Sequence, residues 1–197
     1  HHIALYADDM LFFLRDAGGD LRGAKELLME FGELSGLRVN WGKSCLFPLD
    51  PGAVPQGDTG DLRWEASCFR YLGVKVYHDV ADRLEGNLRV AVRALRSSMV
   101  FWSTLPLSVA GRIALLKMIA LPRLLYFFGT LPVWIPRAIF KELDSLCIAF
   151  IWGSGRRRVA LHKLQRPTRE GGLAVPDFES TILQINCNGT HNGWLID

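Results

Sequence analysis

The spacing of hydrophobic and polar residues changes along the chain, and the change predicts a mixed α+β fold. Near the start, two short apolar runs flank Tyr6-Ala7-Asp8-Asp9, a pattern typical of a tight β-hairpin with both aspartates at its tip. Apolar residues then recur at helical spacing from Leu21 to Leu34. We expect Asp20 to cap this helix and Gly36 to end it.

The next part of the acidic half predicts short strands and a loop. Leu37, Val39 and Trp41 alternate with polar residues as a strand would. Residues 50–66 are rich in Gly, Pro and Asp and predict a loop. Phe69 to Val76 predicts a strand with Gly73 inside it, which marks either a close approach of another backbone or an ordinary bulge. The hairpin, the helix and the strand at Leu37–Trp41 together predict an antiparallel sheet with a helix on one face.

The second half predicts three amphipathic helices. The first is capped by Asp82 and has a stripe of Leu84, Leu88, Val92, Leu95 and Met99. Leu105-Pro106 ends it, and Ser108 caps a second helix that Pro122 should break or kink; its apolar residues are Ile113, Leu116 and Ala120. The third runs from Pro136 to Gly153, with Ile139, Leu143, Leu146 and Phe150 on one face.

Composition narrows the class of protein. The chain has 197 residues, and its first Met is Met10, inside the hairpin, so we expect a fragment of a longer protein. Its four cysteines lie far apart without zinc-ligand spacing, which argues against a zinc site or a disulfide framework and fits a reducing compartment. No signal peptide is visible, and the most apolar stretch, Leu124 to Pro136, is too short to span a bilayer. We expect a cytoplasmic or nuclear protein that is not secreted and has no membrane partner.

Charge is divided unevenly between the halves. Residues 1–85 carry 9 Lys/Arg and 14 Asp/Glu, whereas residues 86–197 carry 14 and 6. This asymmetry indicates an anionic partner for the second half, with nucleic acid the leading candidate and a merely solvated face the alternative. Two clusters carry the interpretation: a helical stripe of Arg89, Arg93 and Arg96, and a glycine-flanked loop of Arg156, Arg157 and Arg158.

Asp8 and Asp9 are the sharpest candidates for chemistry. Adjacent carboxylates repel each other, so such a pair needs a cation or a hydrogen-bonding cradle, and Mg2+ prefers oxygen ligands. The alternative is a solvated turn, because Asp is a common turn residue. Gly36 to Ser44 does not form a phosphate-binding loop, because five residues separate its glycines where the motif has four. Lys43 could still act there as a single cation.

Three ordered motifs in the first half carry a resemblance to a known family. They are Tyr6-Ala7-Asp8-Asp9, the helix followed by Ser35–Ser44, and Tyr71-Leu72-Gly73. In this order and spacing they resemble the last three palm motifs of reverse transcriptases of non-LTR (LINE-type) retrotransposons. Three later segments are similar to the thumb region of the same family: Trp102–Ile113, Phe150-Ile151-Trp152 and Gly171–Asp177.

The resemblance covers about residues 1–180 and implies a domain organisation. Residues 1–81 would be the C-terminal part of the palm, with the Tyr-x-Asp-Asp hairpin, the helix and lysine loop, and the primer-grip strand. Residues 82–180 would be a helical thumb with a basic connection. Residues 181–197 would be a divergent tail, in which Ile185 to Asp197 lack periodicity. The implied fold class is α+β, a partial palm of antiparallel hairpins and a helix followed by an all-α thumb-like region.

The resemblance also implies roles for individual residues. Asp8 would be the main metal ligand and Asp9 a weaker ligand or electrostatic helper, with two Mg2+ ions in the full-length parent. Lys43 would donate a proton to the leaving pyrophosphate. Four residues would line the nucleotide or primer side: Tyr6, Ala7, Leu72 and Gly73. The basic residues named above would hold the backbone of an RNA template and DNA primer, with dNTP the only other small molecule.

Several parts of such a polymerase are missing from the sequence, including the fingers and a further palm aspartate. We therefore expect weak or absent metal binding and no primer extension by this chain alone. Two other interpretations stay open: a catalytically dead nucleic-acid-binding remnant, and a non-functional translated relic. The sequence leaves the oligomeric state open.

Overall fold

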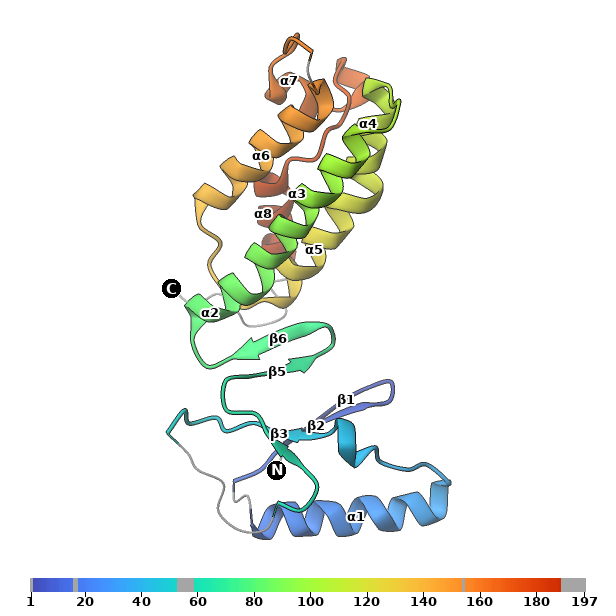
Figure 1. Cartoon of the computed structure of the whole chain (residues 1–197), viewed down its shortest axis with the longest axis vertical. Helices are drawn as coiled ribbons and strands as arrows, with labels where there is room; N and C mark the ends of the chain where they lie inside the picture. The colour runs from blue at the N-terminus through green and yellow to red at the C-terminus, as the bar shows by residue number, and fades with distance from the viewer. Residues whose placement is uncertain (1, 16–17, 53–58, 154, 189–197) are drawn as a thin grey trace. The chain divides into compact units, whose positions relative to one another are not determined.

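The computed structural model describes residues 2–15, 18–52, 59–153 and 155–188 (Figure 1). It confirms the mixed α+β class, with helices and, among the described residues, three sheets of two strands each. The chain forms two compact units, His1–Phe69 and Arg70–Asp197. The expected palm, thumb and tail, residues 1–81, 82–180 and 181–197, are functional divisions and stay a prediction.

The first unit contains a hairpin, one long helix and a small parallel pair of strands. Its elements are β1 (His2–Tyr6), β2 (Asp9–Phe13), α1 (Gly19–Ser35), a 3-10 turn (Trp41–Lys43), β3 (Cys45–Leu46) and β4 (Arg63–Trp64). β1 and β2 pair antiparallel as predicted. β3 and β4 pair in parallel, and β4 lies within residues 50–66, which were expected to form a loop. The expected antiparallel sheet that combines the hairpin with a strand at Leu37–Trp41 is thus wrong.

The sequence correctly predicted that Gly36 ends α1, but it assigned the N-cap of this helix to the wrong residue, Asp20. Gly36 ends the helix with φ 74°, the left-handed conformation that glycine adopts at little cost. Asp20 is not the N-cap, because α1 begins at Gly19 and places Asp20 in its first turn. There its carboxylate accepts a hydrogen bond from the Arg15 amide at 2.9 Å, and a negative charge at this position suits the helix dipole.

The strand expected at Leu37 to Trp41 is also absent. The backbone there is irregular and then turns at Trp41–Lys43. The side chain of Asn40 accepts a hydrogen bond from the Lys43 amide at 3.2 Å. Asn competes in this way with strand pairing, which favours the turn over the alternation of the side chains.

The second unit begins with a hairpin and continues as a helical bundle. Its strands are β5 (Cys68–Tyr71), which crosses the boundary between the units, and β6 (Val74–Tyr77). Its helical segments are α2 (Val80–Arg83), a π-helical segment (Leu84–Arg89), α3 (Val90–Ser103), α4 (Val109–Leu115), a second π-helical segment (Leu116–Ala120), α5 (Leu121–Thr130), α6 (Arg137–Trp152), α7 (Leu161–Gln165), a 3-10 turn (Thr168–Glu170) and α8 (Phe178–Asn188).

The expected strand Phe69–Val76 is divided into β5 and β6 by a turn. Leu72 and Gly73 form this turn with φ values of 47° and 81°. Positive φ at both central residues is the pattern of a type I′ hairpin turn, so Gly73 marks a turn and not a bulge. Leu72 is strained here, because a side chain disfavours this conformation.

The predicted helices of the second unit are confirmed, with corrections at two points. Asp79, and not Asp82, caps the first, accepting a hydrogen bond from the Ala81 amide. Ser108 caps α4 as expected. Pro122 does not break the second helix, because a π-helical segment precedes it and Leu121 bonds to the Leu116 carbonyl five residues back. The π-helical segment shifts the register of the backbone hydrogen bonds, so Pro122 lies in the first turn of α5. A helix does not require a backbone N–H donor at this position, and proline lacks one.

The hydrophobic core lies in the second unit. The predicted stripes of its helices are buried, with Leu88, Leu116, Ile139 and Leu143 fully so, except that Leu84 and Leu146 are partly buried against the core. Figure 1 shows α3, α5 and α6 side by side along the bundle, with α8 packed on α5 and α6. In the first unit, by contrast, Leu34 is 83% exposed, and Leu21 and Leu62 are the buried hydrophobic side chains among its described residues.

Two further expectations concern the second half. Residues 181–188 of the expected tail belong to α8 (Phe178–Asn188), and residues 189–197 lie outside the described part. The run Val109–Thr130 is, by length and composition alone, apolar enough to cross a membrane, and a single helix of this kind is weak evidence for a span.

Candidate active site and nucleic-acid interface

The predicted hairpin brings Tyr6, Ala7, Asp8 and Asp9 together at one tip. Tyr6 pairs with Asp9 across the strands, so Ala7 and Asp8 form a two-residue turn. Ala7 has φ 51°, a conformation usually left to glycine. Holding a non-glycine residue there costs about 1–3 kcal/mol, and such strain clusters at functional sites.

The two carboxylates are exposed at this tip. No side chain in the described part of the chain donates a hydrogen bond or forms an ion pair with Asp8 or Asp9. The described residues also contain no group of three His, Cys, Asp or Glu side chains that could hold a metal ion. Two carboxylates could supply only two of the several oxygen ligands that Mg2+ takes, so Mg2+ binding by Asp8 and Asp9 stays a prediction.

Lys43 lies on a separate turn and is exposed. Within the described ranges it forms no ion pair with the two aspartates. Its turn is fastened to α1 through Trp41, because the Lys25 ammonium lies 5.9 Å from the centroid of the Trp41 ring. The same ammonium donates a hydrogen bond to the Thr59 carbonyl at 3.0 Å.

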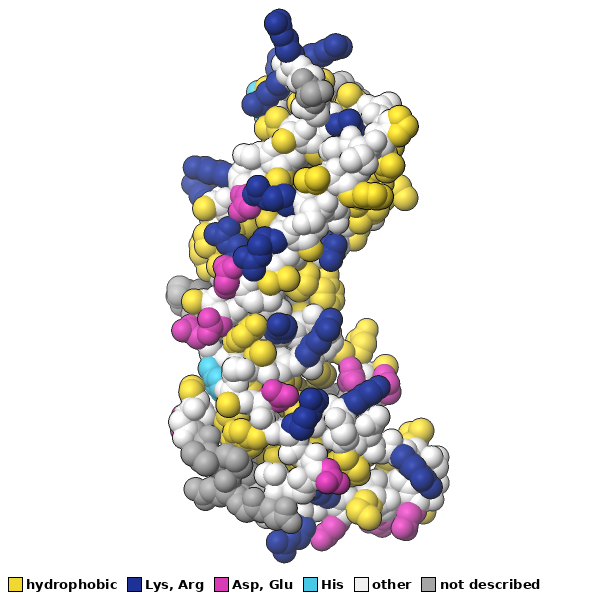
Figure 2. All heavy atoms as spheres, in the orientation of Figure 1, with side chains coloured by type: hydrophobic (Ala, Val, Ile, Leu, Met, Phe, Trp, Pro, Cys, Tyr) yellow, Lys and Arg dark blue, Asp and Glu magenta, His cyan; other side chains and the backbone are white. Residues whose placement is uncertain are grey.

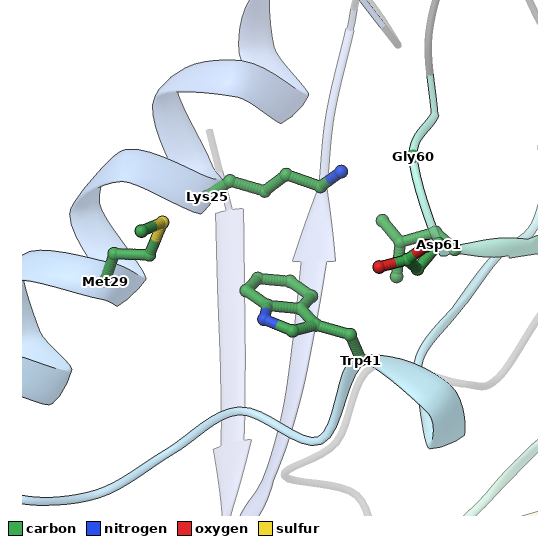
Figure 3. A pocket seen from close by; sticks show the side chains of 6 residues that line it. Lys25, Met29, Trp41, Gly60 and Asp61 are labelled. Carbon is green, nitrogen blue, oxygen red and sulfur yellow. The ribbon is translucent and has the colours of Figure 1, made fainter.

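A shallow hollow of about 200 Å³ lies between α1 and this turn (Figure 3). Its lining residues are Lys25, Met29, Trp41, Gly60, Asp61 and Leu62. None of them is a predicted site residue. The Lys25 chain extends over the indole ring in Figure 3, so the hollow is a by-product of the contact that anchors the lysine turn.

The second hairpin, β5–β6, holds Leu72 and Gly73 at its own tip. Three side chains of the helices bond to its backbone. Tyr126 of α5 donates its hydroxyl hydrogen to the Leu72 carbonyl. Asn87 accepts from the Lys75 amide and donates to the Lys75 carbonyl, both at 2.8 Å. We call the side chains that bond to this hairpin the clasp, and the sequence analysis did not predict it. The available signal was Asn87, a polar residue directly before Leu88 of the predicted apolar stripe.

Arg83 completes the clasp at the other end of β6. Its guanidinium donates to the carbonyls of Tyr77 at 2.8 Å and His78 at 3.0 Å. Asn87 also donates to the Arg83 carbonyl at 2.9 Å. Among the described residues, Asn87 is the one polar residue that is buried, with 4% of its surface exposed. The hairpin tip is thereby fixed on the helical bundle.

The predicted arginine stripe lies on α3 and the last residue of the π-helical segment before it, but glutamates neutralise much of its charge. Arg89 and Arg96 both bond to Glu142 of α6 at 2.9 Å. Arg93 bonds to Glu85 at 2.7 Å. The three residues lie on one face as predicted, and their role in binding a nucleic-acid backbone stays a prediction that these ion pairs weaken.

The three arginines after α6 have no such partners. Arg156, Arg157 and Arg158 are exposed, and none of them forms an ion pair with a described residue. Arg112 of α4 fixes the end of the preceding helix, because its guanidinium donates to the Phe150 carbonyl at 2.7 Å and stacks over the Phe150 ring. The arginine loop therefore begins at an end of α6 that Arg112 holds in place.

The chain was compared with models of known protein families, and no family model matches it.

Proposed function

We propose that this chain is part of an RNA-directed DNA polymerase of a LINE-type retrotransposon. The observation that carries the proposal is the strained hairpin tip at which Asp8 and Asp9, adjacent in the chain, are both exposed. The ordered palm-like and thumb-like motifs support it. RNA template, DNA primer and dNTP would be its partners in the full-length parent.

In that parent, Asp8 and Asp9 would hold Mg2+, which activates the attacking primer hydroxyl and stabilises charge on the transferring phosphoryl group. Tyr6 and Ala7 would line the nucleotide side of the tip. Leu72 and Gly73, fixed by Tyr126 and Asn87, would position the primer end. Lys43 would donate a proton to pyrophosphate.

The hairpin proposal is tested with Mn2+, a paramagnetic substitute for Mg2+, added to the isotope-labelled 197-residue chain. We expect Mn2+ to broaden the NMR signals of residues 6–10 selectively and Asp8→Asn to abolish the effect. A matched control, Glu30→Gln with Glu33→Gln on α1, should leave it unchanged. Broadening that is uniform over all exposed carboxylates would contradict the proposal.

The chain alone should not polymerise, because two carboxylates are too few ligands for a two-metal site. Primer extension on an RNA template with dNTPs and Mg2+ is therefore expected to be absent. Robust extension that Asp8→Asn eliminates would show that the chain carries a complete site.

A second candidate function is nucleic-acid binding without catalysis. The distribution of the core favours it: the buried cluster lies entirely between Val74 and Ile182. The helical unit can thus fold on its own core, whereas Leu5, Leu27 and Leu34 of the first unit are more than half exposed. A salt-sensitive gel shift without any metal dependence would support this alternative.

A further inference from the structure

The helix α1 exposes two neighbouring rows of side chains. Both rows follow the i, i+4, i+7 spacing that places residues on one side of a helix. The first row is apolar, and its members are 60%, 53% and 83% exposed: Leu27, Phe31 and Leu34. The second row is acidic and also exposed: Glu26, Glu30 and Glu33. We name these six residues the acidic helix face.

The charge of the acidic helix face is uncompensated. Residues 26–35 contain three Glu and no Lys, Arg or His. None of the three glutamates forms an ion pair with a described residue. An exposed apolar row on a helix is typical of a surface that packs on another element. The carboxylates beside the row indicate that the opposing element carries positive charge.

The helix Val109–Thr130 of the second unit has the complementary composition. It comprises α4, the second π-helical segment and α5, and it contains three Lys or Arg and no Asp or Glu. One row of its side chains lies in the core: Ile113, Leu116, Ala120, Leu124 and Phe128. Only 28% of its most apolar stretch is buried, however. Because a helix that is apolar on several sides is normally covered on those sides, the outer side of this helix also suits a partner.

The outer side of this helix combines bulky apolar residues with small ones. Met118 is 74% exposed and Ile119 is 41% exposed. Ala110 and Ala114 are exposed one and two turns before Met118, and their small side chains let another helix approach closely. Figure 2 shows hydrophobic side chains gathered over α4 and α5. We define the basic helix face by six residues: Ala110, Ala114, Lys117, Met118, Ile119 and Arg123.

The positive charge of this helix is uncompensated as well. Lys117 donates to the Leu173 carbonyl at 2.8 Å, and Arg112 donates to the Phe150 carbonyl at 2.7 Å. These bonds to neutral carbonyls hold the two side chains without neutralising them. Arg123 is exposed, and none of the three forms an ion pair with a described residue. The basic helix face thus offers the apolar surface and the positive charge that suit the acidic helix face.

We propose that two copies of this chain associate, with the acidic helix face of each packed on the basic helix face of the other. The opposite charges of the two faces favour a second copy as the partner. In a two-fold dimer the contact is made twice, because each copy supplies both faces. The repetition matters, since one helix-on-helix contact is small beside the about 1,600 Å² buried in a standard interface. The proposal requires no part of the proposed function.

Sedimentation equilibrium of the full chain, over a series of concentrations and salt strengths, tests the proposal. We expect the average mass to rise with concentration from that of one copy toward that of two. Association should weaken as salt is added, because the interacting charges lie at the surface. A chain that stays monomeric at every concentration in low salt would overturn the proposal.

The apolar part of the contact is tested on α1. Leu27→Ala combined with Phe31→Ala should weaken association about tenfold or more, because buried apolar anchors supply most of the energy of an interface. The matched control replaces two leucines outside both faces, Leu49→Ala and Leu183→Ala, which are 73% and 58% exposed. The control should change the affinity by less than about twofold. Equal weakening by the two double variants would contradict the assignment of the interface.

An exchange of charge between the two faces is the sharpest test. The first variant makes α1 basic: Glu26→Lys, Glu30→Lys and Glu33→Lys. The second makes the other face acidic: Ala110→Glu, Ala114→Glu and Arg123→Glu. Each variant alone should stay monomeric, because its two faces then carry charge of the same sign. An equimolar mixture should associate, since every contact in the mixed dimer joins opposite charges.

Circular dichroism shows whether each variant keeps its helices. A mixture of folded variants that fails to associate would overturn the proposal. Tighter binding of acidic-lipid vesicles or of a nucleic-acid duplex to the basic helix face, lost in the second variant, would refute the assignment to a second copy. The sedimentation assay contains no metal, primer or dNTP. Its failure would therefore leave the Mn2+ experiment on Asp8 unaffected, and failure of that experiment would leave this proposal standing.

Discussion

Asn87 pairs with Lys75 as a neighbouring strand would, accepting from its amide and donating to its carbonyl, both at 2.8 Å. One side-chain amide thus satisfies two backbone groups of β6 and joins the hairpin to the helices. Its place in a π-helical segment, where the backbone widens, brings the side chain toward the strand.

Asn87→Ala is expected to lower the free energy of unfolding of the helical unit by about 1–3 kcal/mol, because buried backbone groups lose their partners. Urea denaturation measures the loss, and hydrogen exchange at the Lys75 amide should accelerate. Asn40→Ala, which removes an exposed side chain from the first unit, is the control and should leave both readings unchanged. Normal protection of the Lys75 amide in Asn87→Ala would contradict this account of the clasp.

Two helical glycines should respond in opposite directions to alanine. At Gly86 a Cβ atom would meet the Tyr77 hydroxyl at 2.3 Å and its ring at 2.6 Å, whereas at Gly129 nothing lies within 4 Å. Gly86→Ala should destabilise by about 1–3 kcal/mol through overpacking. Gly129→Ala should stabilise by roughly 0.5–1 kcal/mol through helix propensity.

Thermal or urea unfolding of the two variants provides the comparison. Because the overpacking arises from one ring, a Tyr77→Ala background should remove most of the cost of Gly86→Ala. A Gly86→Ala variant as stable as Gly129→Ala would show that the Tyr77 ring moves aside freely.

Elements defined by local spacing could be predicted from the sequence. The α6 helix is an example, because its apolar stripe, Pro136 at its start and Gly153 at its end all lie within one segment. The Tyr6–Asp9 hairpin is another, since its turn joins residues adjacent in the chain. Local chemistry suffices in both cases.

Features that depend on distant partners could not be predicted. Glu142 neutralises Arg89 and Arg96 from 53 and 46 residues away, so the stripe alone suggested a free basic surface. The choice of Asp79 over Asp82 as a cap has a local cause. Arg83 bonds to the carbonyls before the helix and so fixes where the chain turns.

Cys147 should be inert in the folded chain. Burial among the helices raises the pKa of its thiol to about 12, with a further rise from the charge of Asp144. The reactive thiolate is therefore nearly absent at neutral pH. In a Cys187→Ala background, a thiol reagent should modify Cys45 and Cys68, which are partly exposed, and spare Cys147 until urea unfolds the chain.

Mass spectrometry of the labelled peptides identifies which thiol has reacted. Cys147→Ala is the control and should give the same number of labels in the native state. Native labelling of Cys147 at the rate of Cys68 would show that the bundle opens frequently at α6.

Asp144 should make the stability of the bundle depend on pH. Burial raises the pKa of its carboxyl above the ordinary value, and the charges of Asp177 and Glu179 raise it further. The folded state therefore holds this proton more tightly than the unfolded state does. The resulting stabilisation is present below the unfolded pKa of 3.8 and is lost as pH rises through the folded pKa.

Asp144→Asn removes the charge and should increase the free energy of unfolding at pH 7, with little or no increase at pH 3. Urea unfolding at the two pH values measures the difference, and Asp82→Asn, at an exposed position, serves as the matched control. The gain at pH 7 should shrink in an Asp177→Asn background, because one of the repelling charges is then already absent. A decrease in stability at pH 7 would mean that the Asp144 carboxylate is favourably placed, and the repulsion argument would then fail.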